Sequence, residues 1–377
     1  MNAPPRAPYR AAIIGHTGAG DYGHGLDTLF NGRADVRVVA VADPDAAGRA
    51  RVARAANAPA QYADYRQMLA KEKPELISLG PRWTEQRLEM GLAALRAGAH
   101  VFMDKPFMPS LAEADTFVAE AEKRGLRCAL ALPIRLEPGI LFLKQQLAAG
   151  RFGEMIEMHL RSPIDPRVGG EDLVVHGPHL FDLLRFFAGD AAWCTARILH
   201  QGRDATKADA KPALREKLGL VLGDDIHAQF TMPNGVHATY VGAARYLQTS
   251  DGYGFTMVCQ KAVVRVRAGY TPVIEWRDRA VTADRDAWKT FPDDPRAKMP
   301  AAGTPAVGAP AVGNVVQVAN TRLVDDWLAA IANQREPAAS AQSALRALEM
   351  IQAIVVAGLR RERVSLPLRD RAHPLSP

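Results

Sequence analysis

A short apolar strand that runs directly into a glycine-rich loop constrains the fold of this chain most. Residues Ala11–Ile14 are apolar, and the sequence GHTGAGDYGHG follows from residue 15. Such a loop lets the backbone approach a pyrophosphate closely, and a helix after it aims its N-terminal amides at the phosphates. The apolar residues Leu26, Leu29 and Phe30 predict that helix. The pattern is typical of a dinucleotide-binding domain; the alternative is a glycine-rich turn.

The next apolar run indicates which dinucleotide is bound. Val36–Val41 reads as a strand, and Asp43 follows at about the spacing where an acidic residue binds the adenosine ribose. A carboxylate repels the 2′-phosphate of NADP by about 4 kcal/mol at 4 Å and an effective dielectric constant near 20. Pro44 offers no N–H to offset this, and Arg49 and Arg51 are expected on the following helix. The pattern favours NAD over NADP, although Asp43 is alternatively a simple helix cap.

Strand and helix signals alternate through the first third of the chain. This alternation predicts an α/β domain with a doubly wound parallel sheet. The expected strands are Glu75–Leu79, Val101–Met103 and Leu126–Leu132, and the expected helices are Asp45–Ala56, Thr84–Ala97 and Leu111–Arg124.

A lysine follows one of these strands directly. Val101–Met103 runs into Asp104, Lys105 and Pro106. Pro106 fixes its own φ and biases Lys105 toward an extended conformation. Open α/β sheets bind ligands at the carboxyl ends of their strands, so we expect Lys105 on the same edge as the glycine loop. The alternative is a solvated lysine after an ordinary strand.

Length and composition limit the class of protein. A chain of 377 residues is too long for one core, so we expect a domain at 1–131 and a second at 132–377. Whether the terminal helices pack back on the first domain stays open. The net charge of +6 is spread along the chain, which argues against nucleic acid as a partner.

The remaining composition predicts a cytoplasmic protein. The three cysteines, Cys128, Cys194 and Cys259, lie far apart, which is typical of free buried thiols in a reducing compartment. The first residues lack the apolar core of a signal peptide, and we find no apolar stretch of about 18 residues or more, so no membrane span is expected.

The second domain is predicted to be α+β, with an open and mainly antiparallel sheet. Strands dominate after Trp193, and Asn234–Gly235 predicts a hairpin with a type I′ turn. Two segments read as insertions, Gly202–Gly219 and Asp293–Gly313. The other expected elements are a helix at Gly139–Ala149, a strand at Met155–Arg161, helices at Val315–Ala332 and Ala339–Ala357 and a final strand at Val364–Leu366.

Polar residues recur on one predicted helix, His176–Phe187. A charged segment before it, RSPIDPRVGGED at 161–172, is expected to be a loop. His176, His179 and Asp182 follow each other at three-residue intervals, so neighbours in the series share a face. Imidazole and carboxylate are common metal ligands, and histidines can also be structural. Because no HExxH-type pattern is present, we expect no metal.

Several motifs, in this order, resemble the glucose–fructose oxidoreductase and inositol dehydrogenase (Gfo/Idh/MocA) family. They extend over nearly the whole chain, and the set is far more specific than any one motif. They are GHTGAG near the start, Asp43, HVFMDKP, IRLEP at 134–138, GRFGEM at 150–155, GPHLFDLLRFFAG at 177–189 and REP at 335–337.

The resemblance implies an NAD(P)-dependent oxidoreductase acting on a sugar, polyol or glycoside hydroxyl, built as a homodimer or homotetramer. Lys105 matches the family's catalytic lysine, with Asp104 in place of the usual Glu, and His179 matches the acid–base histidine. Expected substrate-binding residues are Arg135, Arg161, His176 and Asp182, with Arg167 as a further arginine. Expected cofactor-binding residues are Gly15, His16, Thr17, Gly18, Gly20, Asp43, Pro81, Trp83, Asp104, Lys105 and Pro106, with Arg82 nearby.

Two positions depart from the family pattern. Val175 stands where an aspartate often precedes the histidine by four residues, and Glu171, Asp172 or His176 are the candidates to replace it. Arg87 stands where a histidine is common. These departures leave two alternatives open: a redox glycosidase that oxidises, eliminates and reduces with NAD retained, and a cofactor-binding regulator without chemistry.

Overall fold

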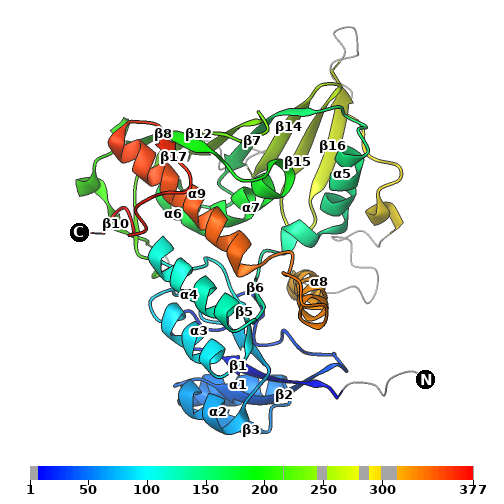
Figure 1. Ribbon diagram of the computed structural model, residues 1–377, viewed down its shortest axis with the longest axis vertical. Helices are drawn as coiled ribbons and strands as arrows, with labels where there is room; N and C mark the ends of the chain where they lie inside the picture. Colours follow the sequence, from blue (N-terminus) through cyan, green and yellow to red (C-terminus); the bar gives the residue numbers. More distant parts are fainter. Residues whose placement is uncertain (1–6, 215, 244–252, 280–287, 299–311, 377) are drawn as a thin grey trace. The chain divides into compact units, whose positions relative to one another are not determined.

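The computed structural model describes residues 7–214, 216–243, 253–279, 288–298 and 312–376 (Figure 1). These form two compact units. The first contains the described parts of Met1–Ala131, Arg215–Leu218 and Val312–Gln342, and the second contains those of Leu132–Leu214, Gly219–Ala311 and Ser343–Pro377. Most of the predicted insertion Asp293–Gly313 lies outside the described residues, apart from its first part, which includes a 3-10 turn at Pro295–Lys298.

The first unit is built on a six-stranded sheet in the order β3-β2-β1-β4-β5-β6, and every pair is parallel. This is the doubly wound sheet that the sequence predicted. Its strands are β1 (Tyr9–Ile14), β2 (Val36–Ala42), β3 (Ala60–Tyr62), β4 (Leu76–Leu79), β5 (His100–Met103) and β6 (Cys128–Leu130). Its helices are α1 (Ala46–Ala55), α2 (Tyr65–Glu72), α3 (Arg87–Arg96), α4 (Leu111–Lys123) and α8 (Val312–Ala332).

The crossover from β1 to β2 differs from the prediction. Within residues 15–35, all of which are described, the structure has turns and bends in place of a helix. Gly18, Gly20, Gly23 and Gly25 all have positive φ, and so does Asp21, which pairs with His16 in an isolated bridge. Glycine costs a helix about 1 kcal/mol per residue relative to alanine, so this density of glycine prevents helix formation. Leu26, Leu29 and Phe30 are nevertheless buried, as core residues.

Helix α8 belongs to the first unit although it lies more than 180 residues after β6 in the sequence. Its Trp327 is fully buried and packs edge-on against Phe102 of β5, with ring centroids 5.7 Å apart. The indole Nε1 donates to the carbonyl oxygen of Arg127 at 3.0 Å. A ring that is buried and has its one polar group satisfied anchors α8 beside the sheet.

The second unit is built on a nine-stranded sheet in the order β16-β15-β14-β7-β13-β12-β8-β17, with β9 paired to β8. Among the described residues, the strand pairs of this sheet are antiparallel except β13 with β7. The strands are β7 (Met155–Ser162), β8 (Trp193–His200), β9 (Arg203–Asp204), β12 (Asp225–Thr231), β13 (His237–Ala243), β14 (Gly254–Cys259), β15 (Ala262–Arg267), β16 (Val273–Asp278) and β17 (Val364–Ser365). Two further strands, β10 (Lys211–Pro212) and β11 (Leu220–Val221), pair with each other.

One face of this sheet forms the core of the second unit. Met158 and Leu160 of β7 share a buried cluster with Leu180 and Phe181. The alternate residues of β7, including Arg161, therefore lie on the opposite face of the sheet. The helices are α5 (Pro138–Ala148), α6 (Gly169–Val175), α7 (Gly177–Ala188) and α9 (Ala341–Arg360), with a 3-10 turn at Pro133–Leu136 and another at Lys207–Asp209.

The hairpin between β12 and β13 is present, but its turn is not type I′. Gly235 has φ +83°, whereas Asn234 is not among the residues with positive φ, which a type I′ turn requires at both central positions. Gly235 N donates to Met232 O at 3.0 Å, and Met232 N donates to Val236 O. The loop is one of the longer connections that place a single glycine in the left-handed region.

By length and composition, α9 is a helix that could cross a membrane, but 67% of its most apolar window is buried inside the structure. Such burial is what a core helix has.

We predict that Trp327→Ala lowers the free energy of unfolding by about 3–5 kcal/mol, because it leaves a cavity beside Phe102. Trp327→Phe keeps an aromatic ring at the site and should cost less. Denaturant unfolding followed by circular dichroism measures both. Val318→Ala, at an exposed position of the same helix, is the matched control, and equal losses for Trp327→Ala and Val318→Ala would contradict the anchoring role.

Candidate active site

Lys105 lies at the carboxyl end of β5 and is only 6% exposed. Its backbone N donates to Asp104 Oδ1 at 2.8 Å, and the peptide bond between Lys105 and Pro106 is cis. The structure therefore excludes the solvated lysine that was the alternative for this position. An elbow of three residues, Asp104, Lys105 and Pro106, holds the buried lysine.

The carboxylate of Asp104 joins this elbow to the glycine loop. It is fully buried and accepts hydrogen bonds from His24, from Nδ1 at 2.9 Å and from the backbone N at 3.1 Å. Burial alone would raise the pKa of Asp104, but the contact with His24 and the charges of Lys105 and Arg87 lower it below its usual range. A Cβ at Gly23 would lie 2.1 Å from Asp104 Oδ2, so this close approach requires glycine.

Arg87 is the residue that holds the elbow from the other side. It is 2% exposed, and its guanidinium donates to the carbonyl oxygens of Asp104, Pro106 and Pro81. Burial lowers the pKa of Arg87 to about 10, so it stays charged at neutral pH. The sequence marked Arg87 only as a departure from the family, because its partners are backbone atoms that no side-chain motif reveals.

Asp43 lies after β2, as predicted, but its carboxylate is fully buried. It accepts hydrogen bonds from Thr17 Oγ1 at 2.7 Å, from Thr17 N and from Asp45 N. The guanidinium of Arg49, on α1, donates to the carbonyl oxygen of Asp43. Asp43 therefore fixes the conformation of the glycine loop, whatever else it binds.

The glycine loop has open space for a dinucleotide at Gly18 but is crowded at Gly15. A Cβ at Gly18 would meet nothing within 4 Å, so open space lies over that part of the backbone. A Cβ at Gly15 would lie 2.1 Å from the ring of Tyr22, which packs directly against that glycine. The residues that would hold NAD are those of the loop, with Thr17 and Asp43 at its base.

Two residues of the predicted insertion Gly202–Gly219 belong to the first unit and contact the segment after β4. Glu216 forms an ion pair with Arg82 at 3.7 Å. The ammonium of Lys217 lies 4.7 Å from the centre of the Trp83 ring. The sequence identified this segment only as charged, since an insertion carries no signal for where it returns.

In the second unit, two predicted substrate ligands bind each other. Arg135 Nε donates to Asp182 Oδ2 at 2.9 Å, and the Arg135 guanidinium also contacts Ser343 Oγ. Asp182 is 1% exposed. This pair thus joins the 3-10 turn after Leu132 to α7, and neither side chain is placed as an open ligand. Arg161 lies on the face of the sheet opposite to the core, so the structure does not bring it to the histidines of α7.

The helix predicted at His176–Phe187 is present as α7 (Gly177–Ala188), and a second helix, α6, precedes it. His176 follows α6 and precedes α7, and the segment before it, expected as a loop, forms α6. Helix α6 places Asp172 one turn before His176, and His176 Nδ1 lies 2.7 Å from Asp172 Oδ1. Two of the three candidates to replace the family aspartate, Asp172 and His176, are therefore hydrogen-bonded to each other. His179 is half-buried in the first turn of α7.

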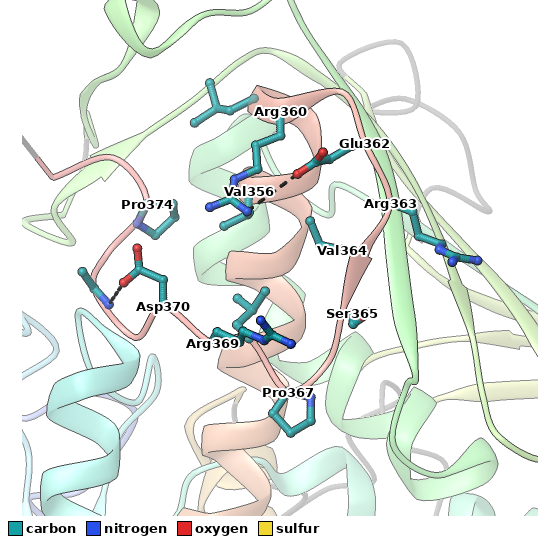
Figure 2. A pocket seen from close by; sticks show the side chains of 13 residues that line it. Val356, Arg360, Glu362, Arg363, Val364, Ser365, Pro367, Arg369, Asp370 and Pro374 are labelled. Carbon is teal, nitrogen blue, oxygen red and sulfur yellow. Dashed lines mark hydrogen bonds and ion pairs between the residues drawn. The ribbon is translucent and has the colours of Figure 1, made fainter.

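A cavity of about 520 Å³ lies between the end of α9 and the C-terminal segment (Figure 2). Arg360, Arg363 and Arg369 line it together with Glu362 and Asp370. Arg360 and Glu362 form an ion pair at 3.7 Å. None of the residues that line this cavity is a predicted site residue.

Comparison with known proteins relates the first unit to a family of NAD-binding oxidoreductases. Residues 9–132 match the oxidoreductase family with an NAD-binding Rossmann fold, Gfo/Idh/MocA. D-apiose dehydrogenase of Paraburkholderia graminis is 23% identical over 354 residues, which cover 89% of this chain and 85% of that protein. Inositol 2-dehydrogenase of Salmonella typhimurium is 29% identical over 139 residues, which cover 36% of this chain and 41% of that protein. The chain spans less than half the length of several curated relatives that it matches.

Among solved structures, an oxidoreductase from Agrobacterium radiobacter in complex with NAD+, L-tartaric acid and magnesium has a TM-score of 0.72 at 17% identity. The match covers 95% of this chain and 98% of that one, and it establishes the fold. Residues 9–132 thus match the NAD-binding Rossmann domain of the Gfo/Idh/MocA oxidoreductase family.

Proposed function

We propose that this protein is an NAD-dependent dehydrogenase that oxidises a hydroxyl group of a sugar, a polyol or a glycoside. The observation that carries the proposal is the buried Lys105, held at the carboxyl end of β5 by an elbow that is hydrogen-bonded to the glycine loop. A regulator without chemistry has no need of a buried lysine in that place. The relatives named D-apiose dehydrogenase and inositol 2-dehydrogenase support a substrate with several hydroxyl groups.

Oxidation of an alcohol requires a base that takes the hydroxyl proton while hydride leaves the same carbon. NAD supplies the hydride acceptor when it is bound. Lys105 is the residue of the first unit that we assign to proton transfer, because its amine can accept a proton from a hydroxyl group and return it. By the family resemblance alone, the second acid–base residue would be His179.

The same proposal includes the setting in which the enzyme works. Cys128, Cys194 and Cys259 are free and buried, which supports a reducing, cytoplasmic location. A homodimer or homotetramer is expected from the family resemblance. We propose that the loop residues Gly15 to Gly20, with Asp43, Pro81 and Trp83, bind the cofactor.

A panel of sugars, polyols and glycosides incubated with NAD tests the activity, with NADH absorbance as the measurement. Accumulation of NADH with at least one compound is expected. Cleavage of a glycoside without net NADH would indicate the redox glycosidase, and NAD binding without turnover of any compound would indicate the regulator.

We predict that Asp43→Ala weakens NAD binding by about tenfold or more, because hydrogen bonds to a charged group contribute about 1.5–3 kcal/mol. The preference for NAD over NADP should narrow at the same time, since the repulsion of the 2′-phosphate is lost. Titration of both cofactors by protein fluorescence measures this. Asp64→Ala, which removes the helix-capping carboxylate of α2, is the control. Equal affinity of the unaltered protein for NAD and NADP would contradict the role of Asp43.

Thr17→Val separates the two duties of Asp43. It removes the hydroxyl that donates to the Asp43 carboxylate at 2.7 Å and leaves the carboxylate in place. If Asp43 acts only by bracing the loop, Thr17→Val should weaken NAD as much as Asp43→Ala does.

We predict that Lys105→Met lowers turnover by at least about 10²-fold, the usual scale for a lost general acid–base group. NAD affinity and the melting temperature should change little, because methionine fills most of the same space. Lys123→Ala, at an exposed position of α4, serves as the control in the turnover, binding and melting measurements. Near-normal turnover by Lys105→Met would remove Lys105 from the chemistry.

A further inference from the structure

We propose that His176, oriented by Asp172, is the proton acceptor of the second unit, in place of His179. The proposal rests on the dehydrogenase function proposed above and names a residue of that same site. It starts from the pairing of the two side chains, with His176 Nδ1 2.7 Å from Asp172 Oδ1. An aspartate that holds one imidazole nitrogen leaves the other nitrogen directed and available for proton transfer.

The contacts on the two ring nitrogens define which of them carries the proton. A guanidinium only donates, and Arg167 Nη2 lies 3.2 Å from His176 Nε2, so Nε2 is the acceptor. Nδ1 then carries the hydrogen and donates it to Asp172. A neutral ring in this tautomer is a base at Nε2.

Asp172 is itself held firmly. It is fully buried, and its second oxygen accepts a hydrogen bond from Tyr240 Oη at 3.2 Å. Burial, followed by the charge of Asp172, raises the pKa of Tyr240 well above its ordinary value, so the phenol stays protonated and donates. Both oxygens of the carboxylate are therefore engaged, one by a tyrosine of β13 and one by His176.

The groups around the Asp172–His176 pair come from four segments. Asp172 lies on α6 and Tyr240 on β13, and Tyr253, just before β14, donates to the His176 carbonyl oxygen and packs edge-on against the ring. The loop before α6 supplies Arg167 and Asp165, whose Oδ2 lies 3.4 Å from Nε2.

Arg167 and Asp165 of this loop both lie close to Nε2 of His176. Burial alone would raise the pKa of Asp165, but hydrogen bonds from the side chain and backbone of Arg167, with the charges of His176 and Arg167, lower it to about 2. Asp165 therefore stays ionised and holds Arg167. Proton transfer to Nε2 then requires the reacting hydroxyl to take the place of Arg167 as the donor to that nitrogen.

The proton step then balances simply. The O–H bond of the substrate would break and its proton would bond to His176 Nε2. NAD, when bound, would supply the acceptor for the hydride from the same carbon, which would become a carbonyl carbon. The ring becomes an imidazolium whose Nδ1–H still donates to the ionised Asp172. His179, the residue that matches the family pattern, has Val175 in place of its usual aspartate.

The first test is turnover as a function of pH. His176→Gln should lower turnover by at least about 10²-fold and remove a limb of the pH profile that falls in the range of histidine. Asp172→Asn should cause a loss of similar size, because an amide that donates to Nδ1 reverses the tautomer. His237→Gln, which removes an exposed histidine of β13, should leave both turnover and profile unchanged. Full turnover by His176→Gln with loss in His179→Gln would overturn the proposal.

The second test needs no substrate. In protein labelled with 15N-histidine, the ring signals that disappear in His176→Gln identify His176, and the Nδ1–H tautomer is expected in the unaltered protein. Asp172→Asn should convert those signals to the Nε2–H tautomer, with the melting temperature and the His237 signals as controls for folding. An Nε2–H tautomer in the unaltered protein would overturn the proposal.

The two tests separate this proposal from the dehydrogenase function. If the tautomer is as expected but no hydroxyl compound is oxidised, the function fails while the Asp172–His176 pair stands. If oxidation occurs and survives His176→Gln, the function stands and the proposal fails. Loss of turnover after treatment with a chelator, restored by a divalent metal, would make the histidines metal ligands and would also overturn it.

Discussion

The buried carboxylate of Asp104 is the interaction on which the first unit depends. It is the point where the glycine loop, through His24, meets the strand that carries Lys105. An ionised group without solvent is stable only when donors surround it, and here His24, the Lys105 amide and the nearby charge of Arg87 do so. Arg87 in turn is held by carbonyl oxygens of the same elbow. Lys105, the glycine loop and Arg87 are therefore connected by one network of hydrogen bonds and charges.

The second unit uses the same physics with different residues. Asp172 is fully buried, and its two carboxylate oxygens are hydrogen-bonded to His176 and to Tyr240. Asp182 is buried against Arg135. In each case a carboxylate that would be costly to bury alone is matched by a specific donor, and each match fixes the direction of one side chain. The core beneath, with Phe181 packed against Tyr240, holds those donors in place.

Much of the first unit followed from the sequence, because its signals are local. The alternation of strands and helices predicted the parallel sheet, and the position of Lys105 at its edge followed from the strand that precedes it. The predicted helix after the glycine loop was wrong. The spacing of the apolar residues Leu26, Leu29 and Phe30 favours a helix, but four glycines in this segment make a helix too unfavourable. Arg87 and His24 were not identified, because their partners are distant in sequence or belong to the backbone.

In the second unit, the sequence analysis did not predict helix α6. The segment before His176, with two glycines and two prolines, was predicted to be a loop, so the four-residue spacing between Asp172 and His176 carried no meaning. On a helix the same spacing places the two side chains one above the other. The role of His179 stays a prediction, because the resemblance that suggests it does not explain Val175.

Helix α6 has a consequence for how this chain can be compared with its relatives. Each residue of an α-helix turns the chain by about 100°, so one inserted or deleted residue between Asp172 and His176 would swing the imidazole to another side of the axis. The spacing between Asp172 and His176 is thus constrained as strictly as the identity of these two residues. An alignment that opens a gap inside α6 to match histidine with histidine erases the feature that distinguishes this chain.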